Sequence, residues 1–222
     1  MTGGQPDGDK TMKRIGQLVL ILLLALGAAN GPALAGGGDV NVLFGQKSLS
    51  DSTLDTAGVD GQFQFGVCLT LDFEGPVMLA IDLLSSSDST TLAIPAAFPL
   101  QLDTDVDTME LDLGVRKFWG QNKIRPFVGG GLAIVRLDAR QTESGTLGTG
   151  APFSTLLVDD HDTGIGLWIN AGFLYRATDR FNVGLDVRYS DANADLSPPM
   201  AGPALGLDSG GTHYGVVLGY HW

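Results

Sequence analysis

The C-terminal end of the chain alternates, with a period of two, between large apolar residues and residues that are mostly small or polar. The apolar positions are Tyr214, Val216, Leu218, Tyr220 and Trp222, and the positions between them are His213, Gly215, Val217, Gly219 and His221. This period predicts a β-strand with one face suited to hydrocarbon and the other suited to a crowded or wet interior. The strand runs to the last residue of the sequence, where its apolar face closes on an aromatic side chain.

The same alternation recurs in seven earlier segments of the chain. They are residues 40–47, 62–73, 77–84, 109–116, 125–137, 165–176 and 181–190. The fifth segment contains Gly129, Gly130 and Gly131, which leave its register open and allow a bulge. The chain has 32 glycines and few charges, a composition that disfavours long helices. These patterns predict an all-β protein of eight strands.

The connections between these segments alternate in length. Short polar turns are expected at 74–76, 120–123 and 177–180. Long loops are expected at 49–60, 85–107, 138–163 and 191–211. Short turns on one rim and long loops on the other are typical of an up-and-down barrel that spans a bacterial outer membrane.

The two faces of the strands indicate which one points outward. Aromatic residues stand near the ends of the apolar stripes, as expected for two interfacial girdles around a hydrocarbon band. These aromatics are Phe73, Tyr175, Phe181, Tyr220 and Trp222 near the turns, and Phe63, Tyr189 and Tyr214 near the loops. A soluble barrel would show the same period with the apolar face inward, so the content of the other face decides between the two.

The other face carries equal numbers of acidic and basic residues. They are Asp72, Asp82, Glu110, Asp112 and Asp186, with Lys47, Arg116, Arg125, Arg176 and Arg188. Isolated charges in an apolar core would be costly, so a balanced set predicts a paired network inside a lumen. The expected fold is therefore an eight-stranded antiparallel up-and-down transmembrane β-barrel whose lumen is filled by side chains.

The N-terminal region has the features of a secretory signal peptide. Lys13 and Arg14 precede an apolar run at 18–29, and Ala33-Leu34-Ala35 matches an A-x-A cleavage site. The run is shorter than the roughly 20 residues that span a bilayer, which disfavours the alternative of a retained anchor. We expect a signal peptide at 1–35, with Met12 as an alternative start, and a barrel domain at 36–222 with both mature termini in the periplasm.

Charge and cysteine content restrict the partners of the chain. The net charge of −12 excludes nucleic acid as a partner. The single cysteine, Cys68, cannot form an intramolecular disulfide, and no cysteine follows the apolar run to accept a lipid anchor. No cofactor is expected.

Four stretches resemble the small eight-stranded outer-membrane barrels of the OmpA and OmpX type. They are residues 39–47, 113–117, 125–131 and 219–222. The resemblance implies an integral outer-membrane protein in contact with lipid and lipopolysaccharide. It also implies that the outer-membrane assembly machinery reads the C-terminal strand, through Tyr214, Val216, Leu218, Tyr220 and Trp222. The fold hosts many activities, so it specifies architecture better than function.

The sequence favours a structural or surface-interaction role, with extracellular ligands bound by the long loops and no catalysis. An alternative is a narrow channel for small apolar molecules that resembles OmpW, because two of the long loops carry apolar residues. These residues are Leu92, Ile94, Phe98, Leu100, Phe153, Leu156 and Leu157. A third alternative is a lipid A-modifying enzyme, although no strand carries the His-x-Ser pair of the deacylases that share this fold. His161 beside acids only loosely imitates the loop histidine of the palmitoyl transferases.

Acidic residues in the long loops raise the question of calcium binding. Asp103, Asp105 and Asp107 alternate in one loop, and acids at 159–162 flank His161 in another. Their oxygens suit Ca²⁺, but neither set has the glycine and distal glutamate of an EF-hand loop. Solvation of an exposed rim explains these acids better, and no metal site is expected.

We predict that the mature protein begins at Gly36, because the A-x-A site ends at Ala35. N-terminal sequencing of protein purified from outer membranes should return a sequence that starts Gly-Gly-Gly-Asp. Recovery of Met1 or Met12 at the N-terminus of membrane-embedded protein would contradict the cleavage.

Overall fold

The structure is a computed structural model that describes residues 37–50, 61–94, 100–120, 123–146, 150–196 and 205–222. The expected signal peptide, most of the expected loop at 49–60 and part of that at 191–211 lie outside the described residues. No helix in the described ranges is long and apolar enough to cross a membrane.

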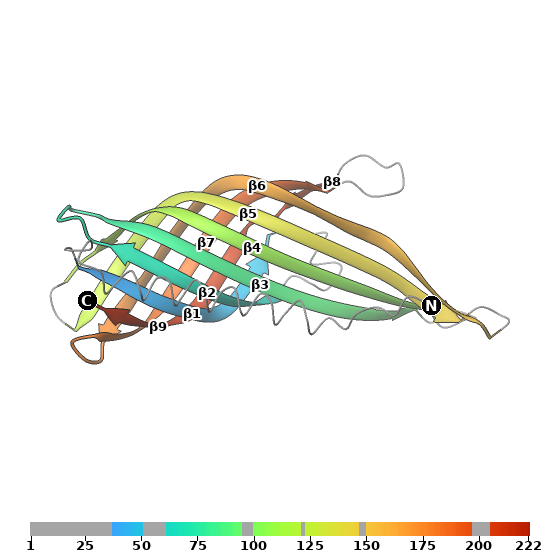
Figure 1. Ribbon diagram of the computed structural model, residues 1–222, viewed down its shortest axis with the longest axis horizontal. Helices are drawn as coiled ribbons and strands as arrows, with labels where there is room; N and C mark the ends of the chain where they lie inside the picture. Colours follow the sequence, from blue (N-terminus) through green and yellow to red (C-terminus); the bar gives the residue numbers. More distant parts are fainter. Residues whose placement is uncertain (1–36, 51–60, 95–99, 121–122, 147–149, 197–204) are drawn as a thin grey trace.

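The described part of the chain folds into β-strands that all pair antiparallel with their neighbours. The strands are β1 (Gly38–Leu49), β2 (Gly61–Leu71), β3 (Met78–Ile94), β4 (Leu100–Phe118), β5 (Ile124–Thr146), β6 (Pro152–Arg176), β7 (Phe181–Leu196), β8 (Leu205–Asp208) and β9 (Gly211–His221). Consecutive strands from β1 to β7 are neighbours, and β9 pairs with both β7 and β1. The sheet therefore closes on itself as an up-and-down barrel (Figure 1).

The barrel wall is eight strands wide, although nine strands are described, because β8 and β9 form one interrupted strand. Asn193 pairs with Asp208 and Ser190 pairs with Gly211, so both pieces follow the same register along β7. Between them, the Ser209 amide still donates to the Ala192 carbonyl at 2.8 Å. The eight-stranded closed barrel expected from the sequence is confirmed.

The apolar faces of the strands point outward and the polar faces point into the lumen. On β6, Ile165 is 72% exposed and Leu167 and Ile169 are also exposed, whereas Trp168 is 1% exposed and Asn170 is buried. The same inside-out pattern holds on β7, where Leu185 faces outward and Arg188 is buried. This arrangement is the opposite of a soluble barrel and matches the hydrocarbon-facing surface of a membrane barrel.

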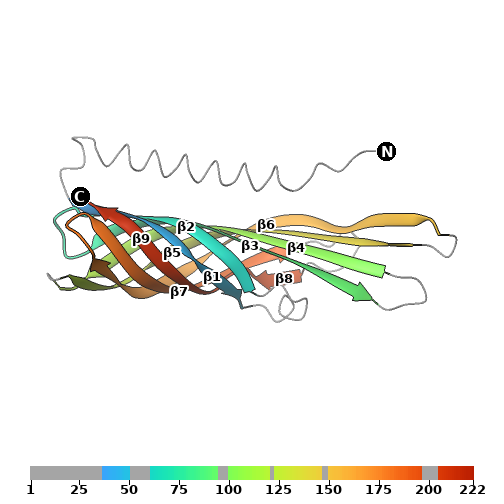
Figure 2. The ribbon, with the colours of Figure 1, turned by 90° about the horizontal axis from the view of Figure 1, so that it is seen from below.

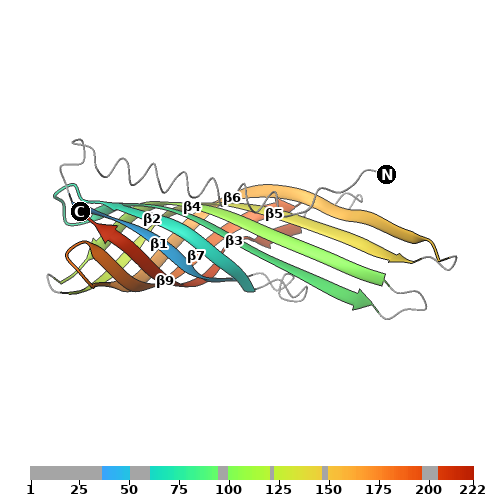
Figure 3. The same ribbon diagram turned by 60° about the horizontal axis from the view of Figure 1, so that its bottom comes forward.

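Two of the expected long loops are in fact mostly strand, so that part of the sequence-based prediction is wrong. The β3–β4 hairpin stays paired out to Ile94 and Leu100, and the β5–β6 hairpin out to Thr146 and Pro152. These four strands project well beyond β1, β2 and β9 on one side of the barrel (Figures 2 and 3). The projection is rich in Ser, Thr and Asp, so the hydrophobic period that marks the barrel strands is absent there.

The glycine-rich segment of β5 keeps a regular register with β4. Gly114 pairs with Gly131 and Arg116 with Gly129, which assigns Gly129 and Gly131 to the lumen face. The irregularity of β5 lies further along, between Gln141 and Thr142 in its pairing with β6. The bulge that the glycines allowed therefore occurs in the projecting region instead.

A cation on the outer face should destabilise the barrel, whereas one on the projection should not. Leu185 and Leu156 suit this comparison because each is 48% exposed, the first on the barrel and the second on the projecting part of β6. Leu185→Arg should cost about 2 to 4 kcal/mol in lipid vesicles and Leu156→Arg close to nothing. Urea unfolding curves measure both, and equal losses would mean that the outer face does not contact hydrocarbon.

Candidate functional site

The centre of the lumen is occupied by a buried ionic cluster around Arg188. Its guanidinium donates to the carboxylates of both Asp82 on β3 and Asp112 on β4. A second cation, Arg116, donates to Asp82 at 2.7 Å, and Asp186 lies 3.7 Å from the Arg188 Nε atom. Each of these side chains is almost completely buried, so the charges are removed from water and rely on one another for compensation.

An indole ring stacks against this cluster. The guanidinium carbons of Arg188 and Arg116 lie 4.9 Å and 5.9 Å from the ring of Trp168, within the range of cation–π contacts. The glycines of β5 make room for this ring. A β-carbon at Gly129 would lie 3.2 Å from a carbon of the Trp168 ring and 2.6 Å from the Asn170 Oδ1 atom. Gly129 is therefore explained by the bulk of its lumen neighbours, whereas a β-carbon at Gly131 would meet the backbone of Leu113 and Gly114.

A second cluster lies nearer the loop end of the lumen. Lys47 on β1 donates to Glu110 at 3.0 Å and to the Ser209 carbonyl at 3.0 Å, where the last strand is interrupted. The Ser190 hydroxyl donates to the same Glu110 carboxylate at 3.3 Å. Lys47 thus neutralises a buried acid and also satisfies a backbone carbonyl at the break in the strand.

The loop-side cluster also brings a serine and a histidine together. The Ser190 Oγ atom lies 3.1 Å from the His213 Nε2 atom, and Gln64 lies 2.8 Å from the opposite ring nitrogen. The sequence search for His-x-Ser on one strand missed this pair because the two residues come from neighbouring strands, β7 and β9. Both side chains are buried in the lumen, so the arrangement offers no approach for a lipid substrate.

A third cluster surrounds Asp39 at the turn end of the barrel. The Asp39 carboxylate accepts a hydrogen bond from Asn182 at 2.7 Å and from Arg125 at 3.4 Å, and it lies 3.1 Å from His221 Nδ1. Arg176 in turn donates to His221 at 2.8 Å. Sequence reasoning missed Asp39 as a lumen acid, although it shares the parity of Lys47 on the first strand and could have been found from that.

A group of apolar side chains packs in the lumen beside the ionic clusters. Its buried members are Leu43, Cys68, Leu84, Phe127, Leu174 and Val217. On β6, for example, Leu174 stands between Arg176 of the turn-side cluster and Asn170, which donates to Asp186 at 2.7 Å. The lumen is therefore filled by ionic clusters together with apolar side chains that pack beside them.

The lumen residues expected from the sequence do not form one continuous network. Asp72 stands apart at the turn rim, where its carboxylate accepts a hydrogen bond from the Glu74 amide at 2.9 Å. Arg176 contacts His221 rather than an acid. Arg116 joins Arg188 at the centre, where both cations contact Asp82. Strand parity predicts which residues face inward, and depth along the strands groups Arg188 with Asp82, Asp112 and Asp186.

The acidic residues of the projection do not converge on a metal site. Across the described ranges, no group of three or more His, Cys, Asp or Glu side chains is arranged to hold a metal ion. Asp103 instead accepts hydrogen bonds from Gln101 at 3.0 Å and Thr91 at 2.7 Å, and these bonds lower the pKa of its carboxyl group. Asp103 is therefore a stably ionised surface group at neutral pH.

A closed eight-stranded barrel with an apolar outer face and a packed ionic lumen defines the class of small outer-membrane barrels. Residues 18–221 match the family described as outer membrane protein beta-barrel domain, and the chain belongs to this family of Gram-negative outer-membrane proteins. Comparison with curated proteins gave no match.

Solved structures of outer-membrane proteins share the fold. The attachment invasion locus protein Ail of Yersinia pestis, in complex with the heparin analogue sucrose octasulfate, aligns with a TM-score of 0.52 and 12% identity. The alignment covers 84% of this chain and 99% of Ail. OprG from Pseudomonas aeruginosa aligns with a TM-score of 0.53 and 17% identity over 85% of this chain and 96% of OprG. At these identities the similarity establishes the fold alone.

Removal of the central cation should destabilise the barrel. Arg188→Ala leaves Asp82 and Asp112 buried with less compensation, and we expect a loss of about 3 to 5 kcal/mol at neutral pH. Protonation of the carboxyl groups at acidic pH removes the uncompensated charge, so the difference from wild type should shrink there. Urea unfolding in vesicles at both pH values measures this.

Arg136→Ala is the matched control for that experiment. It breaks an ion pair with Asp138 of 3.0 Å, but its side chain is largely exposed on the rim. The loss should therefore stay below about 1 kcal/mol. If the two variants unfolded alike at neutral pH, the lumen acids would be solvated and the central cluster would not be closed.

Proposed function

We propose that the protein is an exported structural or surface-interaction barrel of the outer membrane, with a lumen closed to ions and no catalytic activity. The observation that carries this proposal is the central ionic cluster. β7 and β3 are four strand positions apart in either direction around the barrel, yet Arg188 of β7 contacts Asp82 of β3. These contacts therefore cross the lumen and block it at mid-depth.

The proposal places the turns and both mature termini in the periplasm and the projection outside the cell. The last strand closes the barrel against the first, because Gly38 and Trp222 exchange backbone hydrogen bonds of 3.3 Å and 3.1 Å. An assembly machinery that reads the terminal strand and its aromatic would act on the same seam that completes the sheet. The outer face would then lie in lipid and lipopolysaccharide.

The projecting part of β3 to β6 supplies the surface for extracellular contacts. Its strands carry acids at Asp103, Asp105, Asp107, Asp138 and Asp159, and cations at Arg136 and Arg140. Ail was solved with a sulfated sugar, but a polyanion would be repelled by an excess of acids. We therefore expect neutral or cationic partners for this chain.

A second candidate function is a narrow channel for small apolar molecules, as in OmpW. It is favoured by apolar side chains on the projection: Leu92 is exposed and pairs with Leu102, which is partly exposed. Ile94 and Leu100 continue this pairing, whereas Phe98 lies outside the described residues. The third candidate, lipid A modification, would require access to the buried Ser190 and His213. Mass analysis of lipid A from cells with and without the protein tests it.

Electrical recording in planar bilayers tests the closed lumen. Wild-type protein should give no unitary conductance, because the cluster and Trp168 fill the cross-section. Trp168→Ala removes the largest buried lumen side chain and should introduce small, unstable conductance steps. Regular steps from wild-type protein, unchanged by Trp168→Ala, would favour the channel instead.

A further inference from the structure

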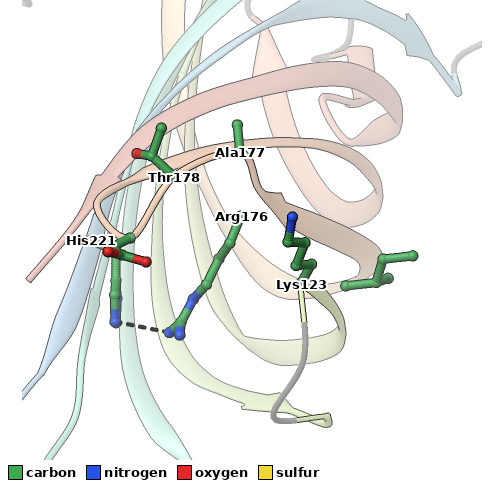
Figure 4. Close-up of a pocket in the computed structure, with 7 residues that line it drawn as sticks. Lys123, Arg176, Ala177, Thr178 and His221 are labelled. Carbon is green, nitrogen blue, oxygen red and sulfur yellow. Dashed lines mark hydrogen bonds between the residues drawn. The ribbon is translucent and has the colours of Figure 1, made fainter.

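A cavity of about 850 Å³ opens at the turn end of the barrel. It is lined by Lys123 and Ile124 at the start of β5, by Arg176 at the end of β6 and residues 177–179 of the turn that follows, and by His221 at the end of β9 (Figure 4). Three separate parts of the chain thus form its wall. The cavity belongs to neither the central cluster nor the projection, so its role is independent of whether the lumen conducts.

The hydrogen bond between Arg176 and His221 holds the Arg176 guanidinium in place on one side of this cavity. A guanidinium has no acceptor, so Arg176 must donate to the His221 Nε2 atom at 2.8 Å. The ring proton of His221 then lies on Nδ1, which donates to the Gly38 carbonyl at 2.9 Å and faces Asp39 at 3.1 Å. His221 therefore accepts a hydrogen bond from Arg176 and positions its guanidinium without supplying an anion.

The two cations of the cavity have no anionic partner among the described residues. No ion pair joins a carboxylate there to Arg176 or Lys123, and the Arg176 Nε atom is buried without a hydrogen-bond partner. Asp39 is already shared by Arg125, Asn182 and His221. Asp179 also lines the cavity and lowers its net positive charge without pairing with either cation. The cavity therefore suits an anion of one charge.

The outer side of the cavity is apolar. Ile124 is 58% exposed and pairs with Tyr175, another exposed side chain on the outer face of the barrel. A ligand that placed an anionic group near Lys123 and Arg176 could extend acyl chains over this face. Phosphate suits both cations, since arginine offers a fork of donors and lysine a point charge.

From this juxtaposition we infer that the cavity binds the phosphate headgroup of an anionic phospholipid from the adjacent leaflet. Lys123 and Arg176 hold the phosphodiester, and His221 acts as a positioning residue for Arg176. The acyl chains lie on the outer face beside Ile124. The site would fix the turn end of the barrel against the lipid interface.

Native mass spectrometry of the full mature protein in detergent tests this inference, with dihexanoylphosphatidylglycerol as the probe. Dihexanoylglycerol, which lacks phosphate, and inorganic phosphate alone serve as separate arms. One phosphatidylglycerol molecule should bind in preference to either. Lys123→Gln and Arg176→Gln should each weaken that binding by about tenfold, as expected for the loss of a charge-assisted hydrogen bond.

Arg180→Gln is the matched control, because it removes the same charge from the same turn at a residue that does not line the cavity. It should change the affinity by less than about twofold, because its side chain does not line the cavity and does not contact the phosphate. Lys123 is exposed and makes no side-chain contact with a carboxylate, so Lys123→Gln keeps the test valid if Arg176→Gln fails to fold. Equal weakening by Arg180→Gln, or none by Lys123→Gln, would overturn the inference. Binding of inorganic phosphate as tight as that of the lipid would overturn its lipid part.

Discussion

The buried guanidinium of Arg188 is the group on which the lumen of this barrel depends. In a closed sheet the backbone hydrogen-bonding groups pair with one another. Eight strands, however, enclose an interior that is too narrow for free water, and its side chains here are too polar for an apolar core. One arginine on β7 resolves this conflict by reaching carboxylates on β3 and β4 across the lumen. The opposite walls are thus tied together by charge, where a soluble barrel would use hydrophobic packing.

The clusters on either side of this one also pair buried acids with buried donors. Asp39 gathers Arg125, Asn182 and His221 at the turn end, and Glu110 gathers Lys47 near the loop end. Beside these clusters, packed apolar side chains exclude water and lower the local dielectric. Charge pairing in the lumen is therefore stronger than it would be in a continuous aqueous pore.

The sequence predicts the strands and their faces because a period of two is imposed by the pleat itself. Strand parity and antiparallel pairing also predict that Asn170 and His213 lie beside Arg188. The strand register shows both pairs. The depth of each residue along its strand also groups Arg188 with Asp82, Asp112 and Asp186, and the structure brings these side chains together. The atoms that meet across the lumen follow from tilt and stagger, which leave no local pattern in the sequence. The projection was missed for a different reason: Ser, Thr and Asp interrupt its apolar residues, so these strands have no regular hydrophobic period.

The projection leaves strand edges uncovered. β6 pairs with β7 from Gly166 onward, and among the described strands its outer stretch pairs with β5 alone. Such an edge is a template for strand addition by a second chain. Here it carries Asp159, Asp160 and Asp162 in close succession, so an identical edge would bring like charges together. In a crowded membrane, this acidic strand edge would let neighbouring copies lie close together without pairing their sheets into a fibre.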